Sequence, residues 1–238
     1  MKAKHLALAL LVFIVSVPTI GSTYQLIIGD GQCQPLSSTP VVSISPANTI
    51  VYSETGTIFT VNVTITNATD LYVWQAGISF NATILEALSF EEGPFLKQKG
   101  TTLWTPGTID NFAGIIHYHA SALTGDITGV NGNGTIGTIT FRTRNYGNSA
   151  IQLIEVILLD SHLSDIDKTV VHGTAEVRIA GDANGDRKVD TFDLHRLGRA
   201  YSSDPSKPNW NADCDFNGDQ KVDNTDLTIL NTNYGRTI

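Results

Sequence analysis

The chain lacks most features that mark enzymes and nucleic-acid-binding proteins. Its 238 residues include only two cysteines, and no Cys-x-x-Cys pair or Cys/His spacing of a zinc site occurs. A nucleophile elbow, a phosphate-binding loop and a zinc-protease motif are also absent. The net charge is −8 without a basic patch, which argues against nucleic-acid binding. We therefore expect a protein without an active site.

Only one long hydrophobic run occurs, near the N-terminus. Leu6–Val17 is apolar and follows Lys2 and Lys4, as in a secretory signal. The run has roughly a dozen residues, whereas a membrane span needs about 20. We assign residues 1–22 to a signal peptide and 23–40 to a leader, with an uncleaved membrane anchor as the alternative. Nothing later is apolar enough to span a membrane, so the mature protein is expected to be secreted or on the cell surface.

The cysteines and the glycosylation motifs are compatible with export. An oxidising exterior would permit a bridge between Cys33 and Cys214, although two free or intermolecular thiols fit the sequence equally well. Four Asn-x-Thr motifs would suit an exported glycoprotein, but so short a motif also arises by chance in threonine-rich strands. These motifs begin at Asn62, Asn67, Asn81 and Asn133.

The middle of the chain alternates between apolar and polar residues, which is typical of half-buried strands. Phe59, Val61, Val63 and Ile65 would share one face, and residues 74–80 repeat the pattern. Many short strands separated by Gly/Asn turns predict a mainly β, two-sheet antiparallel sandwich. The further candidate strands are Val41–Ser45, Gly114–Ser121, Gly134–Thr143, Ala150–Leu158 and Thr174–Ile179. The predicted turns are Asn67–Asp70, Pro106-Gly107 and Gly129–Gly134.

Residues 41–179 resemble a cohesin domain in the order of their sequence phrases. The resemblance implies a jelly-roll sandwich in which one sheet face binds dockerins, and a cellulose-binding module of similar architecture is the nearest alternative. The phrases are Val41-Val-Ser-Ile-Ser-Pro46, Asp70-Leu-Tyr-Val-Trp-Gln-Ala-Gly-Ile-Ser-Phe80, Gly93-Pro-Phe-Leu96, Gly132-Asn-Gly-Thr-Ile-Gly-Thr-Ile-Thr-Phe141 and Ala175-Glu-Val-Arg-Ile179.

The last part of the chain contains one calcium-loop pattern twice, at Asp182–Asp193 and Asp215–Asp226. Oxygen-bearing side chains occupy loop positions 1, 3, 5, 9 and 12, and a backbone carbonyl fills position 7, as in an EF-hand. A short amphipathic helix is predicted after each loop. The pattern predicts two Ca²⁺ ions. Their predicted ligands are Asp182, Asn184, Asp186, Lys188, Asp190, Asp193, Asp215, Asn217, Asp219, Lys221, Asp223 and Asp226.

Two loop positions depart from the general EF-hand pattern. Position 12 is Asp193 or Asp226 rather than a longer Glu, so each following helix should lie closer to the ion. Position 6 is Arg187 or Gln220 rather than Gly. We expect these two residues to adopt a backbone conformation that Gly accepts more easily.

Residues 181–235 resemble a dockerin module, through Gly181-Asp-Ala-Asn-Gly-Asp186 and the repeated Val-Asp-x-x-Asp-Leu phrase. The resemblance implies that calcium folds the module and that loop positions 10 and 11 contact a cohesin. The resulting partner-binding candidates are Thr191, Phe192, Asn224 and Thr225. The two pairs differ, so two equivalent binding orientations are not expected. Packing of Phe192 between the helices is the alternative for that residue.

Other candidate sites have simpler interpretations. His117 and His119 would share one strand face and could chelate a metal, but no third ligand is apparent and a solvated strand face is the expectation. A glycosidase role for Glu91-Glu92 needs a carboxylate across a cleft, and a surface loop is expected instead.

The three tryptophans bear on sugar binding. We expect Trp74 in the core and Trp210 against the second loop–helix unit. Trp104 is the one candidate for an exposed aromatic side chain.

Together these features predict a non-catalytic, calcium-dependent adaptor, with a cohesin-like sandwich at 41–179 and a dockerin-like module at 180–238. Candidate partners are cohesin- or dockerin-bearing proteins, in assemblies on polysaccharides or at the cell surface. Almost no linker joins the halves, so mutual recognition would occur head-to-tail between molecules. The alternative function is a carbohydrate-binding module that carries a dockerin.

Overall fold

The structure is a computed structural model, and it describes residues 39–52, 56–125 and 128–238. The predicted signal peptide, most of the leader, and Cys33 lie outside the described residues. Cys214 is buried and has no disulfide partner among the described residues, so the bridge to Cys33 stays a prediction. In the described part of the chain, no helix is both long and apolar enough to cross a membrane.

Twelve strands precede two helices in the described residues. The strands are β1 (Val41–Ser45), β2 (Asn48–Tyr52), β3 (Ile58–Leu71), β4 (Val73–Ser79), β5 (Leu85–Glu92), β6 (Thr102–Thr105), β7 (Thr108–Asp110), β8 (Ile115–Leu123), β9 (Val130–Thr143), β10 (Gly147–Leu159), β11 (Thr169–Val171) and β12 (Gly173–Arg178). The helices are α1 (Thr191–Ala200) and α2 (Asn224–Asn233), with short 3₁₀ turns η1 (Leu96–Gln98) and η2 (Ala212–Cys214).

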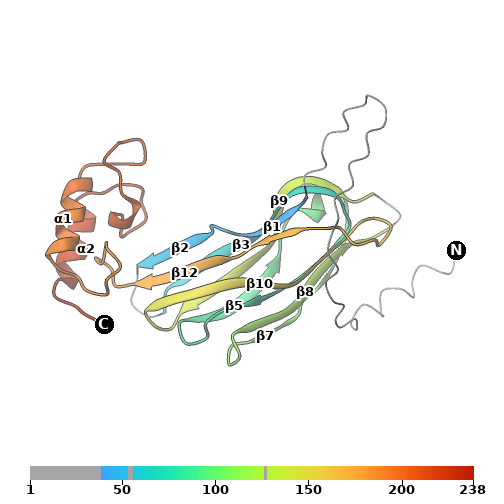
Figure 1. The fold of residues 1–238 in the computed structure, drawn as a ribbon, viewed down its shortest axis with the longest axis horizontal. Coiled ribbons are helices and arrows are strands. Elements are labelled where there is room, and N and C mark those ends of the chain that lie inside the picture. Colours follow the sequence, from blue (N-terminus) through green and yellow to red (C-terminus); the bar gives the residue numbers. More distant parts are fainter. Residues whose placement is uncertain (1–38, 53–55, 126–127) are drawn as a thin grey trace, which may run out of the picture. The chain divides into compact units, whose positions relative to one another are not determined.

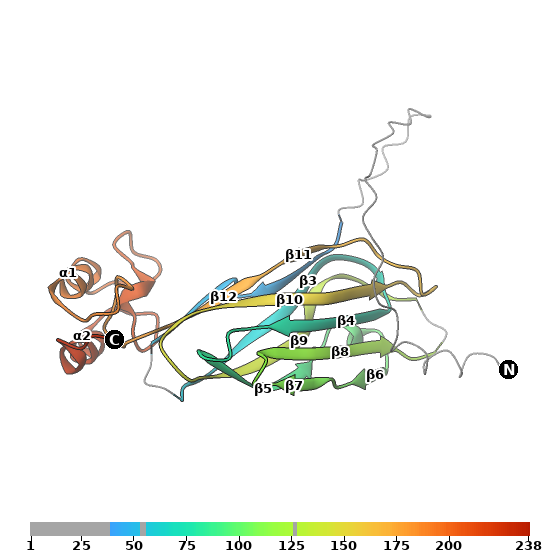
Figure 2. The ribbon, with the colours of Figure 1, turned by 60° about the horizontal axis from the view of Figure 1, so that its bottom comes forward.

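The strands form the two layers of a jelly-roll sandwich (Figures 1 and 2). One sheet has the order β11-β1-β3-β9-β5, and the other has the order β2-β12-β10-β4-β8-β6 with β7 beside β8. The prediction of a mainly β sandwich is confirmed. Most neighbouring strands are antiparallel, as predicted, and two pairs are parallel, β1 with β11 and β2 with β12.

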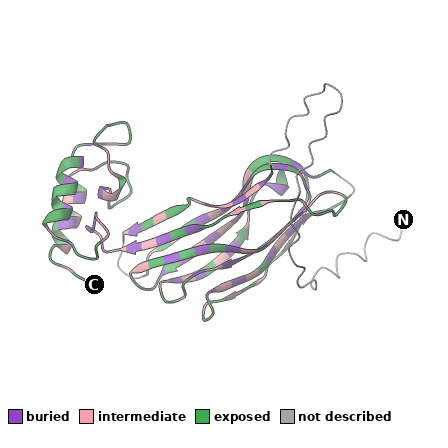
Figure 3. Cartoon of the chain, viewed as in Figure 1, coloured by how far each residue is buried: buried purple, intermediate pink, exposed green. Residues whose placement is uncertain are grey.

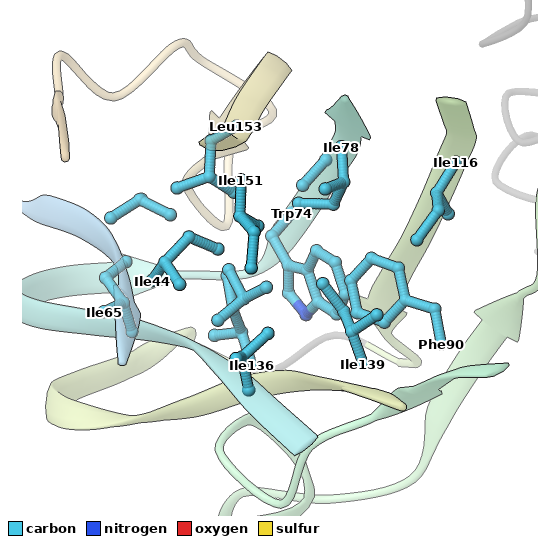
Figure 4. Packing of buried hydrophobic residues seen from close by; sticks show 14 of the residues in the cluster. Ile44, Ile65, Trp74, Ile78, Phe90, Ile116, Ile136, Ile139, Ile151 and Leu153 are labelled. Atoms are coloured by element: carbon cyan, nitrogen blue, oxygen red, sulfur yellow. The ribbon is translucent and has the colours of Figure 1, made fainter. Parts of the chain in front are cut away.

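The core lies between the two sheets, and buried residues alternate with more exposed ones along many of the strands (Figure 3). Trp74 of β4 is buried, as predicted, and packs against Phe90 with ring centroids 6.1 Å apart. Ile139 of β9 lies in the same cluster (Figure 4). Alternation places large apolar side chains on the inner face, and burial of their surface provides the main favourable term in folding.

Two predicted turns lie within strands instead. Asn67–Asp70 belongs to β3, where Asn67 and Asp70 have φ values of 56° and 55° and the register with β9 shifts twice. Most of the predicted turn at Gly129–Gly134 belongs to β9, which begins at Val130. These irregularities are β-bulges, which use turn-forming residues without ending the strand. Pro106-Gly107 does separate β6 from β7.

A bulge in β8 corrects the prediction for the two histidines. Tyr118 has a φ of 42°, and the register with β4 shifts at this point. The extra residue turns His119 into the core, where it is 3 % exposed and stacks on Phe90 at 4.5 Å. His117 is partly exposed and stacks beside Tyr118. The two imidazoles therefore do not share a strand face, and the chelating arrangement is not formed.

Two further side chains differ from expectation. Glu91 and Glu92 end strand β5 rather than lying in a loop, and Glu92 forms an ion pair with Lys97 at 2.9 Å. Trp104 is partly buried against the core, with its ring centroid 5.8 Å from that of Trp74. Trp104 is thus not the exposed aromatic side chain that was expected.

Gly137 of β9 lies against the ring of Phe90, which suggests a test of the core packing. A Cβ atom at Gly137 would lie 2.1 Å from Phe90 Cε2. The ring is held by Trp74 and His119, so Gly137→Ala should lower the free energy of unfolding by about 1–3 kcal/mol, as overpacking usually does. Urea unfolding followed by tryptophan fluorescence measures this.

Gly198 of α1 is the matched control, because a Cβ atom added there would have no neighbour within 4 Å. Gly198→Ala should be neutral or stabilising by up to about 1 kcal/mol, since Ala is the better helix former. Equal stability of Gly137→Ala and the unaltered protein would contradict the tight packing of β9 on Phe90.

Candidate calcium centre and docking surfaces

Both predicted loops fold around their first aspartate in the same way. The Asp182 carboxylate accepts hydrogen bonds from the N–H groups of Gly185 (2.7 Å) and Arg187 (2.9 Å). The Asp215 carboxylate accepts them from Gly218 and Gln220, both at 2.9 Å. This equivalence shows that the sequence repeat is also a structural repeat.

The acidic residues at loop positions 9 and 12 also begin the helices. Asp190 is the N-cap of α1, and its side chain accepts from Phe192 N at 2.8 Å. Asp193, at the third helical position, accepts from Asp190 N at 2.8 Å, which completes a capping box. Asp223 and Asp226 form the same capping box in α2. Loop closure and helix initiation therefore depend on the same side chains.

Three of the predicted ligands are carboxylates with almost no exposure. Asp182 is 1 % exposed, and Asp193 and Asp226 are 0 % exposed. Burial raises the pKa of all three carboxyl groups, although backbone N–H groups oppose the shift. For Asp193, the negative charges of Asp182 and Asp186 raise the pKa further. Buried carboxylates with like-charged neighbours are costly unless a cation is bound or a proton is taken up.

The donor set fits a hard cation. Carboxylate and amide oxygens at the spacing of an EF-hand are the ligands that Ca²⁺ prefers, and bound Ca²⁺ would supply the positive charge that these groups lack. Asn184 and Asp186 lie on the exposed side of the first loop, and Asn217 and Asp219 on that of the second. The number of ions that the two loops bind stays a prediction.

One further cluster of potential metal ligands occurs among the described residues, at Asp70, Asp160 and His162 of the sandwich. Asp70 already accepts hydrogen bonds from Ser161 Oγ at 2.6 Å and from Gly129 N at 2.5 Å. These bonds hold the segments at Gly129 and Ser161 against β3, so Asp70 stabilises the fold without a metal.

The two loop–helix units support each other through short backbone bridges. Val189 of the first loop exchanges hydrogen bonds with the segment that follows α2, through Gly235 N (2.8 Å) and Arg236 O (3.0 Å). Val222 of the second loop does the same with Ser202 and Ser203, which follow α1. Both valines are fully buried. Each unit is therefore completed by the other.

Position 6 of each loop has the left-handed backbone that the sequence predicted. Arg187 has a φ of 70° and Gln220 a φ of 65°. Non-glycine residues pay a steric cost of roughly 1–2 kcal/mol in this region. The loops retain this conformation because their N–H groups bond to Asp182 and Asp215.

The four predicted partner-binding residues are all exposed. Phe192 is 69 % exposed, so it does not pack between the two helices. Thr191, Asn224 and Thr225 are exposed at the starts of α1 and α2. The two helix faces differ: α1 also exposes His195, Arg196 and Arg199, whereas α2 exposes Thr228, Asn231 and Thr232.

Trp210 lies partly buried against the core of the C-terminal module, as predicted in outline. It also lines a groove of about 400 Å³ with Pro208, Arg196 and Arg199. The groove therefore adjoins the basic side of α1.

Two bulges lie on the outer face of the larger sheet, and the sequence did not predict them. Tyr118 of β8 and Glu155 of β10 both have positive φ, on opposite sides of β4. Tyr118 Oη donates to Glu155 Oε1 at 3.4 Å, and β4 has only Gly77 between them. A Cβ atom at Gly77 would lie 3.0 Å from Ile154 Cγ1. The lack of a side chain there lets the two bulges meet, and bulges are common beside functional sites.

The described residues thus combine a jelly-roll sandwich with two calcium-type loop–helix units. A cohesin domain model matches residues 48–177, more than half of the chain, and a dockerin type I domain model matches residues 180–233. The chain belongs to the cohesin family, and a dockerin type I domain follows its cohesin domain. Both are non-catalytic interaction domains, and they indicate cohesin–dockerin association.

Among solved structures, the chain resembles a non-cellulosomal cohesin from the hyperthermophilic archaeon Archaeoglobus fulgidus. The identity is 15 %, the match covers 59 % of this chain and 91 % of that chain, and the TM-score is 0.46. It also resembles the third ScaC cohesin of Acetivibrio cellulolyticus, solved with the ScaB dockerin, at 16 % identity, 60 % and 100 % coverage and a TM-score of 0.48. No curated protein matches the chain at a significant level.

The left-handed conformation of Arg187 can be tested by substitution. Arg187→Gly should raise the free energy of unfolding by about 0.5–1 kcal/mol, because the relief of strain exceeds the added entropy of the unfolded chain. Thermal unfolding with Ca²⁺ present measures the change. Arg187→Ala is the control, since it removes the same side chain but keeps the strained backbone. If both variants raise the free energy of unfolding equally, the cause is the loss of the Arg187 side chain and not the relief of backbone strain.

The raised pKa values predict opposite pH dependence with and without calcium. A carboxyl whose pKa is higher in the folded state stabilises that state most below the unfolded value, near 3.9, and this stability is lost as pH rises through the folded pKa. In chelator, lowering the pH from 7 to 5 should therefore stabilise the module. With Ca²⁺, the same change should weaken it, because protons compete with the ion.

Hydrogen exchange of peptides from residues 180–238 measures the stability of the module at each pH separately from that of the sandwich. Asp193→Asn should reduce the pH dependence in chelator, since the amide does not titrate. Exchange is corrected for the intrinsic rates at each pH. If the module in chelator then becomes less protected between pH 7 and pH 5, the prediction from the raised pKa values is contradicted.

Proposed function

We propose that the protein is an extracellular, non-catalytic adaptor whose C-terminal module binds two Ca²⁺ ions and docks onto the sandwich of another molecule. The observation that carries the proposal is the pair of loops that bury Asp182, Asp193 and Asp226 and also cap the helices. Calcium at these loops would offset the buried negative charge and thereby fix the helices that present the docking surface. The ligands are those predicted from the sequence.

The docking surface of the module is proposed to centre on α1. Phe192 offers a large exposed apolar side chain, and Arg199 lies two turns further along the helix. Exposed aromatic and arginine side chains are the residues that most often dominate binding energy at interfaces. The corresponding part of α2 offers Asn224, Thr225 and smaller polar residues. The inequality of the two helices supports one preferred binding orientation.

The docking surface of the sandwich is proposed to be the outer face of β10, β4 and β8. It presents Tyr118, Glu155 and the partly exposed Ile154, all set by the paired bulges. The outer face of the smaller sheet is instead rich in Thr side chains and includes the glycosylation motif at Asn62. A glycan there would leave the proposed docking face free.

A second copy of the chain is the first partner to consider. Glu155 on the sandwich and Arg199 on α1 have opposite charge, which would favour a head-to-tail contact between molecules. Cohesin- or dockerin-bearing proteins in polysaccharide-degrading or cell-surface assemblies are the wider partner class. Sugar binding by the sandwich has less support, because Trp104 is partly buried.

Two complementary variants test the proposed contact. Phe192→Glu should disable the module surface, and Glu155→Arg the sandwich surface. Each variant alone should stay monomeric in Ca²⁺, while their mixture should form a dimer, since each supplies the surface that the other lacks. Unaltered protein should form longer chains. Sedimentation velocity measures the oligomeric state of the unaltered protein, each variant and the mixture. Chelator should convert the assemblies of the unaltered protein and of the mixture into monomers.

Phe112→Glu is the control, because Phe112 is 98 % exposed in the β7–β8 turn and belongs to neither surface. It should assemble like the unaltered protein. Unaltered protein that remains monomeric in Ca²⁺ would contradict self-recognition, and assembly that persists in chelator would contradict calcium dependence.

A further inference from the structure

The sandwich passes into the calcium module without a spacer. Strand β12 ends at Arg178, and the next residue, Ile179, is 0 % exposed within the module's apolar cluster. Asp182 N donates to Ile179 O at 3.0 Å, so the first loop begins on the residue that leaves the strand. Residues 38–238 also group as one compact unit. The module core is therefore partly built by the end of the sandwich.

Strand β2 adds an aromatic contact to this core. The Tyr52 ring meets the Phe216 ring edge-on, with centroids 5.1 Å apart, and Tyr52 Oη donates to Asp213 O at 2.9 Å. Burial raises the pKa of Tyr52, so the hydroxyl keeps its proton. Phe216 lies in the second loop, and its N–H donates to Asp226 at 2.8 Å. One residue therefore connects the sandwich tyrosine to a predicted calcium ligand.

Strand β12 contacts the first loop through Arg178. Its guanidinium forms ion pairs with Glu176 at 2.7 Å and with Asp213 at 3.8 Å, and its side chain is only 12 % exposed. It lies against Gly185, where a Cβ atom would be 3.1 Å from Arg178 Cζ. The buried Nε and Nη1 atoms have no hydrogen-bond partner. This packing requires the first loop to be folded beside the sandwich.

A third contact joins the end of the chain to the sandwich. Arg236, which follows α2, donates from Nη2 to Tyr146 Oη at 3.2 Å. We name these contacts the interdomain clamp; its residues are Tyr52, Tyr146 and Arg178 of the sandwich and Asp213, Phe216 and Arg236 of the module.

We propose that the interdomain clamp couples the calcium loops to strands β2 and β12, so that calcium binding rigidifies the adjoining end of the sandwich. The inference rests on the proposed binding of calcium. A ligand that binds only the assembled state stabilises every part that must be folded for binding. Coupling is reciprocal, so weakening the clamp lowers the affinity for calcium. The clamp would also keep a module from reaching the docking face of its own sandwich.

Hydrogen exchange on the full chain tests this coupling. With saturating Ca²⁺ instead of chelator, protection should rise about tenfold in residues 48–52 and 173–178, which contain no predicted ligand, as well as in 180–238. Strand β8 is the internal reference and should not change. The measurement needs no variant, so it remains informative if a variant fails to fold.

Tyr52→Phe removes only the hydroxyl that crosses the interface. It should lower calcium affinity by about threefold to tenfold, as expected for one hydrogen bond, and reduce the protection gained at 48–52. Tyr72→Phe is the matched control, because Tyr72 Oη donates to Gly125 O at 2.6 Å wholly within the sandwich. It should leave calcium affinity unchanged.

The outcomes separate the coupling from calcium binding itself. Protection confined to 180–238, or equal affinities of the Tyr52→Phe and Tyr72→Phe variants and unaltered protein, would overturn the coupling while leaving calcium binding in place. A lack of calcium-dependent protection anywhere in the chain would overturn the proposed function, and the inference with it.

Discussion

Burial of negative charge in the two loops is the constraint on which the C-terminal module depends. Asp182, Asp193 and Asp226 are almost wholly removed from water, and carboxylates in such positions need a cation, a proton or a dense set of hydrogen-bond donors. Backbone N–H groups satisfy part of this requirement, yet the pKa values remain raised. The module is too small for a large apolar core, so the loops decide whether it folds.

The same carboxylates determine the helix starts, and through them the position of the proposed docking surface on α1. Because Asp190 and Asp193 cap α1, any movement of the loop away from a bound ion would also release the first turn that carries Phe192. The proposed recognition by Phe192 would therefore depend on calcium, although Phe192 is not itself a predicted ligand. The predicted ligands Asp190 and Asp193 and the proposed recognition residue Phe192 thus lie within one helical turn.

The sequence was sufficient where one chemical requirement determines a fixed spacing. Calcium coordination fixes oxygen ligands at defined loop positions, so the loops, the helices and the left-handed Arg187 and Gln220 could all be predicted. Alternation likewise placed Trp74 in the core. The bulge at Tyr118 could not be predicted, because it depends on how β8 packs against β4 and Phe90. His117 and His119 flank Tyr118, so strand alternation predicted that they share one face. Because of the bulge they lie on opposite faces.

The contacts of the interdomain clamp could not be predicted from the sequence pattern either, since Tyr52 and Arg178 resemble ordinary strand residues. Their importance follows from position: β2 and β12 are parallel neighbours, and Tyr52 pairs with Arg178 at the point where the chain leaves the sandwich. The ends of these strands offer the aromatic Tyr52 to the second loop–helix unit and the cationic Arg178 to the first loop. The missing linker, which the sequence did show, makes such contacts unavoidable. A longer linker would let the module orient freely, and calcium could then act only on the module itself.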